Sequence, residues 1–161
     1  MSCGNIIQIS DHPIPLNERM SASCYTPDDW FTREVSSMIT DTEDYQADLT
    51  WLYNIFAGLV EQPYLIFHGV FVFKPDFKQI WFADKHRAFI EEAQRLAKVS
   101  LDDFIRCVDL CDLRDAYSTQ YEAYVCYTEE SSEVTFTLDE FIRSALPGRA
   151  YYIGGACDYT F

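Results

Sequence analysis

The stretch that most constrains this fold runs from residue 64 to residue 82. Its first ten residues, YLIFHGVFVF, are almost continuously apolar and rich in β-branched and aromatic side chains, which is typical of a strand buried on both faces. The next four residues, KPDF, have the composition of a turn, and residues 78–82 can return as a second strand. We therefore expect a hairpin over 64–82 at the centre of a sheet.

Helical and strand-like patterns alternate along the rest of the chain. Apolar spacing predicts helices starting near residues 26, 40, 84, 100 and 137, and strand patterns lie at 6–9, 120–136 and 150–161, the last two as hairpins. In the 150–161 hairpin, Gly154-Gly155 is the expected turn. The pattern predicts an α+β fold, with an antiparallel or mixed sheet seeded by the 64–82 hairpin and about four helices packed over it. A length of 161 residues fits a single globular domain, 1–161, whose residues 1–26 form a partly extended N-terminal segment.

Three hydroxyl residues are expected to cap helices. Thr26 precedes Pro27 and two acids, while SLDDFIR from Ser100 and TLDEFIR from Thr137 match almost residue for residue. The shared start chemistry explains this likeness without a duplication, because the preceding sequences do not align. In the helix after Ser100, we expect one buried face formed by Leu101, Phe104, Val108 and Cys111.

The formal charge of −14 is unevenly distributed along the chain. Residues 64–99 carry six bases against four acids, whereas residues 1–63 carry ten acids against two bases and residues 100–161 carry twelve against four. Such a surface repels phosphate backbones, so direct nucleic-acid binding is not expected, and it attracts basic proteins.

The carboxylates in three groups are the predicted partner-binding residues. Taken singly, each group can also be read as a solvated face, but the overall excess of acids costs self-repulsion, which favours a role for them. The groups are Asp41, Glu43, Asp44 and Asp48; Asp102, Asp103, Asp109, Asp112 and Asp115; and Glu129, Glu130 and Glu133.

Motifs for catalysis, cofactors or metals do not occur in the sequence. A phosphate-binding glycine loop, a zinc-protease helix and a serine elbow are all missing, so no cofactor is expected. Six cysteines without a C-x-x-C pair are expected to be thiols and mostly buried; Cys107 and Cys111 can share a metal, but core packing is favoured. A dyad of Cys126 or Cys157 with His68 or His86 is conceivable. We expect neither a secretory signal nor a membrane span, and hence a cytoplasmic protein.

Residues 78–108 locally resemble the ribbon-helix-helix pattern of small repressors and antitoxins. The likeness consists of a short strand at Ile80-Trp81-Phe82, the helix HRAFIEEAQRLAKV and then SLDDFIR, about a fifth of the chain. The strand carries no row of basic or amide side chains to read bases, so the resemblance implies a helical hairpin and not its DNA-binding function.

The leading functional hypothesis is a non-enzymatic acidic protein that inhibits a basic nucleic-acid-handling partner. Small acidic DNA mimics that phages and plasmids direct against restriction or CRISPR systems share this composition, and an immunity protein for a basic nuclease fits equally well. The alternatives are a small carboxylate- or cysteine-dependent enzyme and a ribbon-helix-helix-like antitoxin or regulator.

Overall fold

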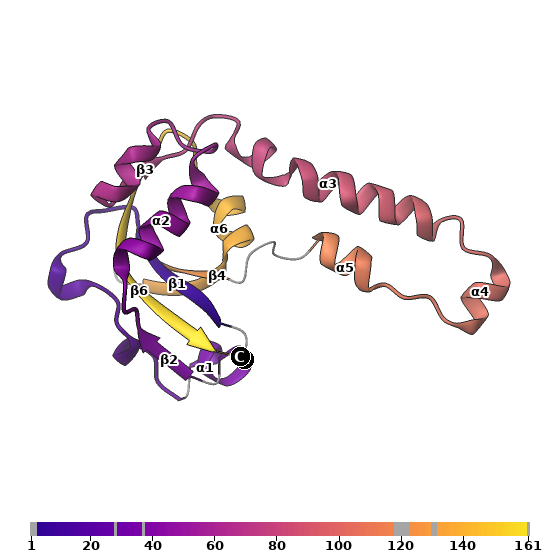
Figure 1. Cartoon of the computed structure of the whole chain (residues 1–161), viewed down its shortest axis with the longest axis horizontal. Coiled ribbons are helices and arrows are strands. Elements are labelled where there is room, and N and C mark those ends of the chain that lie inside the picture. Colours follow the sequence, from indigo (N-terminus) through magenta and orange to yellow (C-terminus); the bar gives the residue numbers. More distant parts are fainter. Residues whose placement is uncertain (1–2, 28, 37, 118–122, 130–131, 161) are drawn as a thin grey trace.

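A mixed β-sheet forms the body of the molecule, and a helical arm projects from it (Figure 1). The computed structural model describes residues 3–27, 29–36, 38–117, 123–129 and 132–160. In chain order the elements are β1 (Cys3–Ser10), η1 (Leu16–Glu18), η2 (Ala22–Cys24), α1 (Trp30–Glu34), β2 (Met38–Asp41), α2 (Tyr45–Phe56), η3 (Pro63–His68), β3 (Val70–Val72), α3 (Phe77–Leu96), α4 (Leu101–Arg106), α5 (Cys111–Tyr117), β4 (Ala123–Glu129), β5 (Ser132–Thr137), α6 (Leu138–Ser144) and β6 (Ala150–Thr160), where η marks a 3₁₀ helix.

The sheet has the strand order β2-β6-β1-β4-β5, with β3 also paired to β6. β1 runs parallel to β4, and the other pairs are antiparallel. The predicted α+β class with a mixed sheet is therefore confirmed. β1 extends beyond the predicted 6–9 and lies inside the sheet, between β6 and β4.

The predicted 64–82 hairpin is wrong. Residues 63–68 form the 3₁₀ helix η3, which starts at Pro63 and is ended by Gly69 in the left-handed conformation (φ 77°). Only Val70–Val72 form a strand, and the expected return strand is the beginning of α3. An apolar run marks burial but does not specify helix or strand. Phe71 and Phe73 are fully buried, and Phe77 and Trp81 from the first turns of α3 join the same core.

The predicted C-terminal hairpin is also wrong, because β6 is one continuous strand. Gly154 and Gly155 lie at a β-bulge, where the pairing with β1 shifts between Ile7 and Ile9. A Cβ on Gly154 would lie 2.1 Å from the side-chain oxygen of the buried Gln8. That same oxygen accepts hydrogen bonds from the backbone N–H of Gly155 and Met20, at 3.0 and 2.8 Å. The two glycines therefore allow close packing of the strand against Gln8 and the segment before η2.

Two apolar clusters occupy the two faces of the sheet. The larger one joins Ile7 and Ile9 to α2, η3, α6 and the first turns of α3, and the smaller one joins Ile6 and Cys157 to Phe31 of α1. Alternate residues of β1 thus serve opposite cores, as the two-residue period of a strand requires.

The two N-terminal α-helices begin later in the chain than predicted. α1 begins at Trp30 with Asp29 in the N-cap position, so Thr26 does not cap it. α2 begins at Tyr45, because residues 38–41 pair with β6 as strand β2. The predicted caps at Ser100 and Thr137 are confirmed: each hydroxyl accepts a hydrogen bond from the backbone N–H three residues on.

Candidate interaction surface on the helical arm

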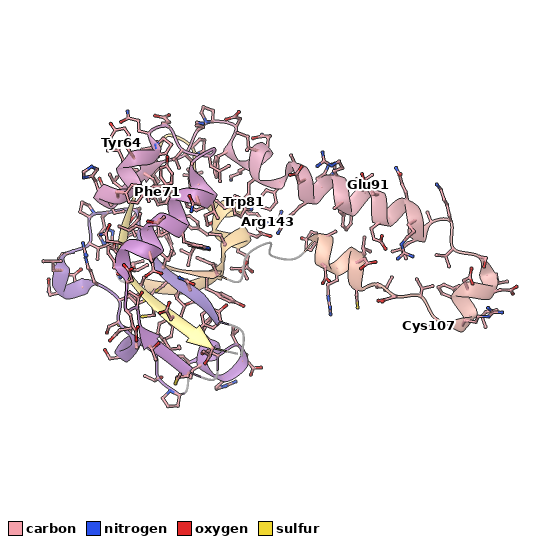
Figure 2. The ribbon with its side chains drawn as sticks, in the orientation of Figure 1. Tyr64, Phe71, Trp81, Glu91, Cys107 and Arg143 are labelled. Carbon is pink, nitrogen blue, oxygen red and sulfur yellow. The ribbon has the colours of Figure 1, made fainter. Side chains whose placement is uncertain are left out.

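The arm consists of α3, α4 and α5, and its root is fixed to α6. The indole N–H of Trp81 donates to Asp139 at 2.8 Å, and Lys85 forms an ion pair with the same carboxylate, which is only 5% exposed. The guanidinium of Arg143 lies 4.3 Å from the ring centre of Phe82. Figure 2 shows Trp81 and Arg143 close to the point where the arm leaves the body. Since these contacts join α3 to α6, the arm has a defined position at its root.

A groove runs between α3 and α5. It contains two cavities, of about 250 Å³ and about 470 Å³, which share Phe89 and Tyr117. The rings of these two residues lie 6.1 Å apart, and α5 packs along α3 (Figure 1). The remaining lining residues are Phe82, Lys85, His86, Leu110, Cys111, Leu113, Arg114, Ala116 and Arg143. The groove is therefore mainly apolar, and the permanently charged side chains that line it are all cationic.

At the tip of the arm, α4 buries none of its residues. Leu101 and Ile105 are each 72% exposed and Phe104 is 69% exposed, which contradicts the predicted buried face. Cys111 is exposed as well, and Val108 is partly buried. The predicted helix is confirmed only for Leu101–Arg106, because residues 107–110 are not helical and Cys111 begins α5, and the arm carries Leu101 and Phe104 away from the sheet. A cluster of large exposed apolar side chains marks an interaction surface.

The second carboxylate group is spread along the arm: Asp102 and Asp103 lie on α4, Asp109 lies between the two helices, and Asp112 and Asp115 lie on α5. Asp102, Asp103, Asp109, Asp112 and Asp115 are all exposed. Asp103 receives a hydrogen bond from the Ser100 hydroxyl, and Asp109 accepts one from the backbone N–H of Cys111 at 2.8 Å, which holds the pKa of Asp109 below its usual value. The Arg114 guanidinium lies 3.6 Å from the Asp115 carboxylate. Among the described residues, the other four carboxylates of this group have no Lys or Arg within ion-pair range. Over its whole length, residues 77–117, the arm carries eight acids against seven bases, so its acidic excess is confined to residues 100–117.

The first carboxylate group has structural roles at the start of α2. Asp41 accepts a hydrogen bond from the backbone N–H of Ala22 at 2.6 Å, and Asp44 caps α2. Asp48 is 5% exposed and accepts from the Asn5 side chain at 2.7 Å, so its carboxylate does not contribute to an exposed acidic surface. Glu43 is exposed.

The third group lies at the end of the β4–β5 hairpin. Glu129 and Glu133 are exposed, and Glu130 lies outside the described residues. β2 and β5 are at opposite ends of the strand order, so the first and third groups belong to opposite sides of the sheet while the second lies on the arm. The three groups do not form one continuous patch.

The conceivable cysteine–histidine dyads are not assembled. Cys126 and Cys157 are buried beneath α1 in the smaller core, and burial raises the pKa of each thiol to about 12, which disfavours the nucleophilic thiolate. His86 lies on the arm and His68 is exposed at the end of η3.

A metal site is not supported either. Cys107 (φ 149°) ends α4 and Cys111 begins α5, so the two do not share a helix, and both are exposed, not packed in the core as favoured. The described residues contain no group of three His, Cys, Asp or Glu arranged to hold a metal ion.

The ribbon-helix-helix resemblance does not extend to the strand of that pattern, because residues 80–82 belong to helix α3.

No family model matches the sequence, and neither a curated protein nor a solved structure is significantly similar to it. No helix within the described ranges has both the length and the apolar character needed to cross a bilayer.

The groove was not predicted from the sequence, although part of its signal was present. Phe82, His86, Phe89, Ala93 and Leu96 recur at alternating intervals of four and three residues, the spacing of a helix that packs against another helix. Arg143 and Tyr117 come from distant parts of the chain, and only the tertiary structure brings them to the groove.

Proposed function

We propose that this protein is a non-enzymatic acidic binding protein that inhibits a basic, nucleic-acid-handling protein in the cytoplasm. Its partner would be a nuclease or another protein with a cationic nucleic-acid groove, as for anti-restriction and anti-CRISPR DNA mimics or nuclease immunity proteins. The arm would be the element that docks on this partner.

The acidic segment 100–117 of the arm supports this proposal. Residues 100–117 carry five acids against Arg106 and Arg114. These carboxylates stand on an arm that projects from the body, so a partner can approach them (Figure 1). A basic groove that normally binds DNA accommodates about one negative charge per 1.7 Å of duplex axis, and closely spaced carboxylates can compete for such a site.

The second acidic group also favours a mode of binding in which long-range electrostatic attraction guides the partner to the arm, and not one strong contact. Exposed ion pairs contribute only about 0.2–1 kcal/mol each, whereas many like charges raise the encounter rate with a basic partner. Affinity should therefore depend on several arm carboxylates together and should fall steeply with salt, since the Debye length is only about 10 Å at 0.1 M.

The test is inhibition of a panel of basic nucleases by the full chain, with copurification to find the natural partner. We expect Asp112→Lys with Asp115→Lys to abolish inhibition, because attraction becomes repulsion at exposed positions of α5. Glu18→Lys with Glu61→Lys is the matched control, since it makes the same change in net charge on the body. Equal inhibition by the arm variant and the wild-type protein, with both folded, would remove the arm from the proposal. Equal loss in both variants would mean that net charge alone acts.

A further inference from the structure

We propose that two copies of this chain pair through their arms, with α4 of each copy seated in the α3–α5 groove of the other. The proposal rests on an uncovered apolar helix and an uncovered apolar groove with complementary charges, and not on the inhibitory function proposed above.

The first half of the contact is the tip helix α4. Leu101, Phe104 and Ile105 together leave α4 with its apolar side chains in solvent. Asp102 and Asp103 lie between them in sequence and are also exposed. As a separate unit, α4 is thus a short acidic and apolar helix that lacks a covering surface within the described residues.

The second half is the groove between α3 and α5. Phe89 and Tyr117 line both of its cavities, and Arg114, Arg143 and Lys85 are the permanently charged groups that line it. Lys85 is already paired with Asp139, and Arg143 lies over Phe82 and Tyr117, whereas Arg114 is 74% exposed beside Asp115. The groove therefore fits an apolar segment with negative charge, and α4 has both properties.

The shape of the arm makes the contact reciprocal. α3 has 20 residues and is about 30 Å long, with the groove beside residues 82–89 in its middle and α4 beyond its far end (Figure 1). Two arms lying antiparallel can place each tip beside the groove of the other arm. This gives a closed, two-fold arrangement in which both copies bury the same surfaces, the commonest symmetry of protein oligomers.

Charge does not forbid this pairing despite the −14 carried by each copy. At physiological ionic strength the Debye length is about 8 Å, so the two bodies repel each other weakly across the length of the arms. At the contact itself, acids of α4 face cations of the groove, and residues 64–99, which contribute α3, have more bases than acids. Asp112 and Asp115 do not line the groove, so pairing leaves them accessible to a basic partner.

The oligomeric state of the full chain is the measurement, by sedimentation velocity and native mass spectrometry at low and high salt. We expect a dimer that persists in high salt, because apolar burial is not screened, whereas inhibition of a basic nuclease is lost there. A wild-type protein that stays monomeric up to the highest soluble concentration overturns the pairing and leaves the function proposed above untouched.

Two charge-reversed variants identify the surfaces. The tip variant Asp102→Lys with Asp103→Lys and the groove variant His86→Glu with Arg114→Glu change only exposed side chains. Each should raise the dimer dissociation constant at least about tenfold. Mixed together they should form a heterodimer, identified by its mass, because both of its contacts again join opposite charges. Controls with the same changes in net charge on the body, Glu18→Lys with Glu61→Lys and Asn17→Glu with Arg33→Glu, should remain dimeric. A dimer that survives both arm variants, or variants that fail to rescue each other, contradicts the arrangement.

Discussion

Replacing Phe71 with alanine should cost the protein about 4–5 kcal/mol of unfolding free energy. Phe71 is fully buried on β3, with ring centres of Phe73, Phe56 and Tyr151 at 5.2, 5.4 and 5.6 Å. A Phe→Ala change in a core typically costs ~3–5 kcal/mol, and each aromatic pair contributes about 0.5–1.5 kcal/mol within such totals. We take the upper part of the range because the surrounding rings are fixed by further stacking, such as Phe73 on Phe77 at 4.2 Å, and so cannot collapse into the cavity.

Urea denaturation followed by fluorescence and circular dichroism measures this loss. For an m-value near 2 kcal/mol/M, the midpoint should fall by about 2 M urea. Phe67→Ala is the matched control, because Phe67 is 41% exposed and its ring contacts Tyr53 at 5.2 Å, so about 1 kcal/mol is expected. A loss for Phe71→Ala below 1 kcal/mol, or no larger than for the control, would refute the assignment of β3 to the core.

Three further perturbations test local chemistry. Thr137→Ala should lower the free energy of unfolding by about 1 kcal/mol, because it removes the capping box of α6. Thr26→Ala should change the thermal melt very little, because Thr26 does not cap α1. Equal losses in the two variants would contradict the observed helix starts. In native protein at pH 8, Cys126 and Cys157 should resist iodoacetamide while the exposed cysteines react, since a pKa of about 12 leaves roughly one thiol in ten thousand ionised. Peptide mapping that finds buried and exposed cysteines equally labelled would contradict this prediction. Burial, and after it the nearby acids, raise the pKa of Asp158, so the folded state disfavours the charged form of this side chain. The resulting loss of stability grows as the pH rises from the unfolded pKa through the folded pKa. Asp158→Asn should therefore raise Tm at pH 7 but little at pH 3, and an equal gain at both pH values would exclude the charge as the cause.

Local chemistry allowed several elements to be predicted from sequence alone. The hydroxyl caps at Ser100 and Thr137 were identified correctly because a cap needs only one side chain and a backbone N–H three residues away. The β4–β5 hairpin followed from a polar turn between two β-prone segments, and the α+β class followed from the mixture of patterns.

The apolar run at 64–82 and the two glycines at 154–155 were misassigned because their structure depends on distant residues. The run supplies core side chains from a 3₁₀ helix, a short strand and a long helix, and β1 and β6 form the centre of the sheet that we had assigned to this run. Gly154-Gly155 has the composition of a turn, yet β6 continues through a bulge at these glycines, and the side chain of Gln8, 146 residues earlier than Gly154, packs beside them.

The charge of the candidate surface was set by the sequence, but its location was not. Counting residues gave the −14 charge and the acidic segment 100–117, since composition does not depend on folding. Apolar spacing showed that Leu101 and Phe104 share a helix face, but spacing cannot tell whether another element covers that face. The tertiary structure decided this by fixing α3 to α6 through Asp139 at the root and leaving α4 beyond the reach of the sheet, where its apolar side chains meet solvent.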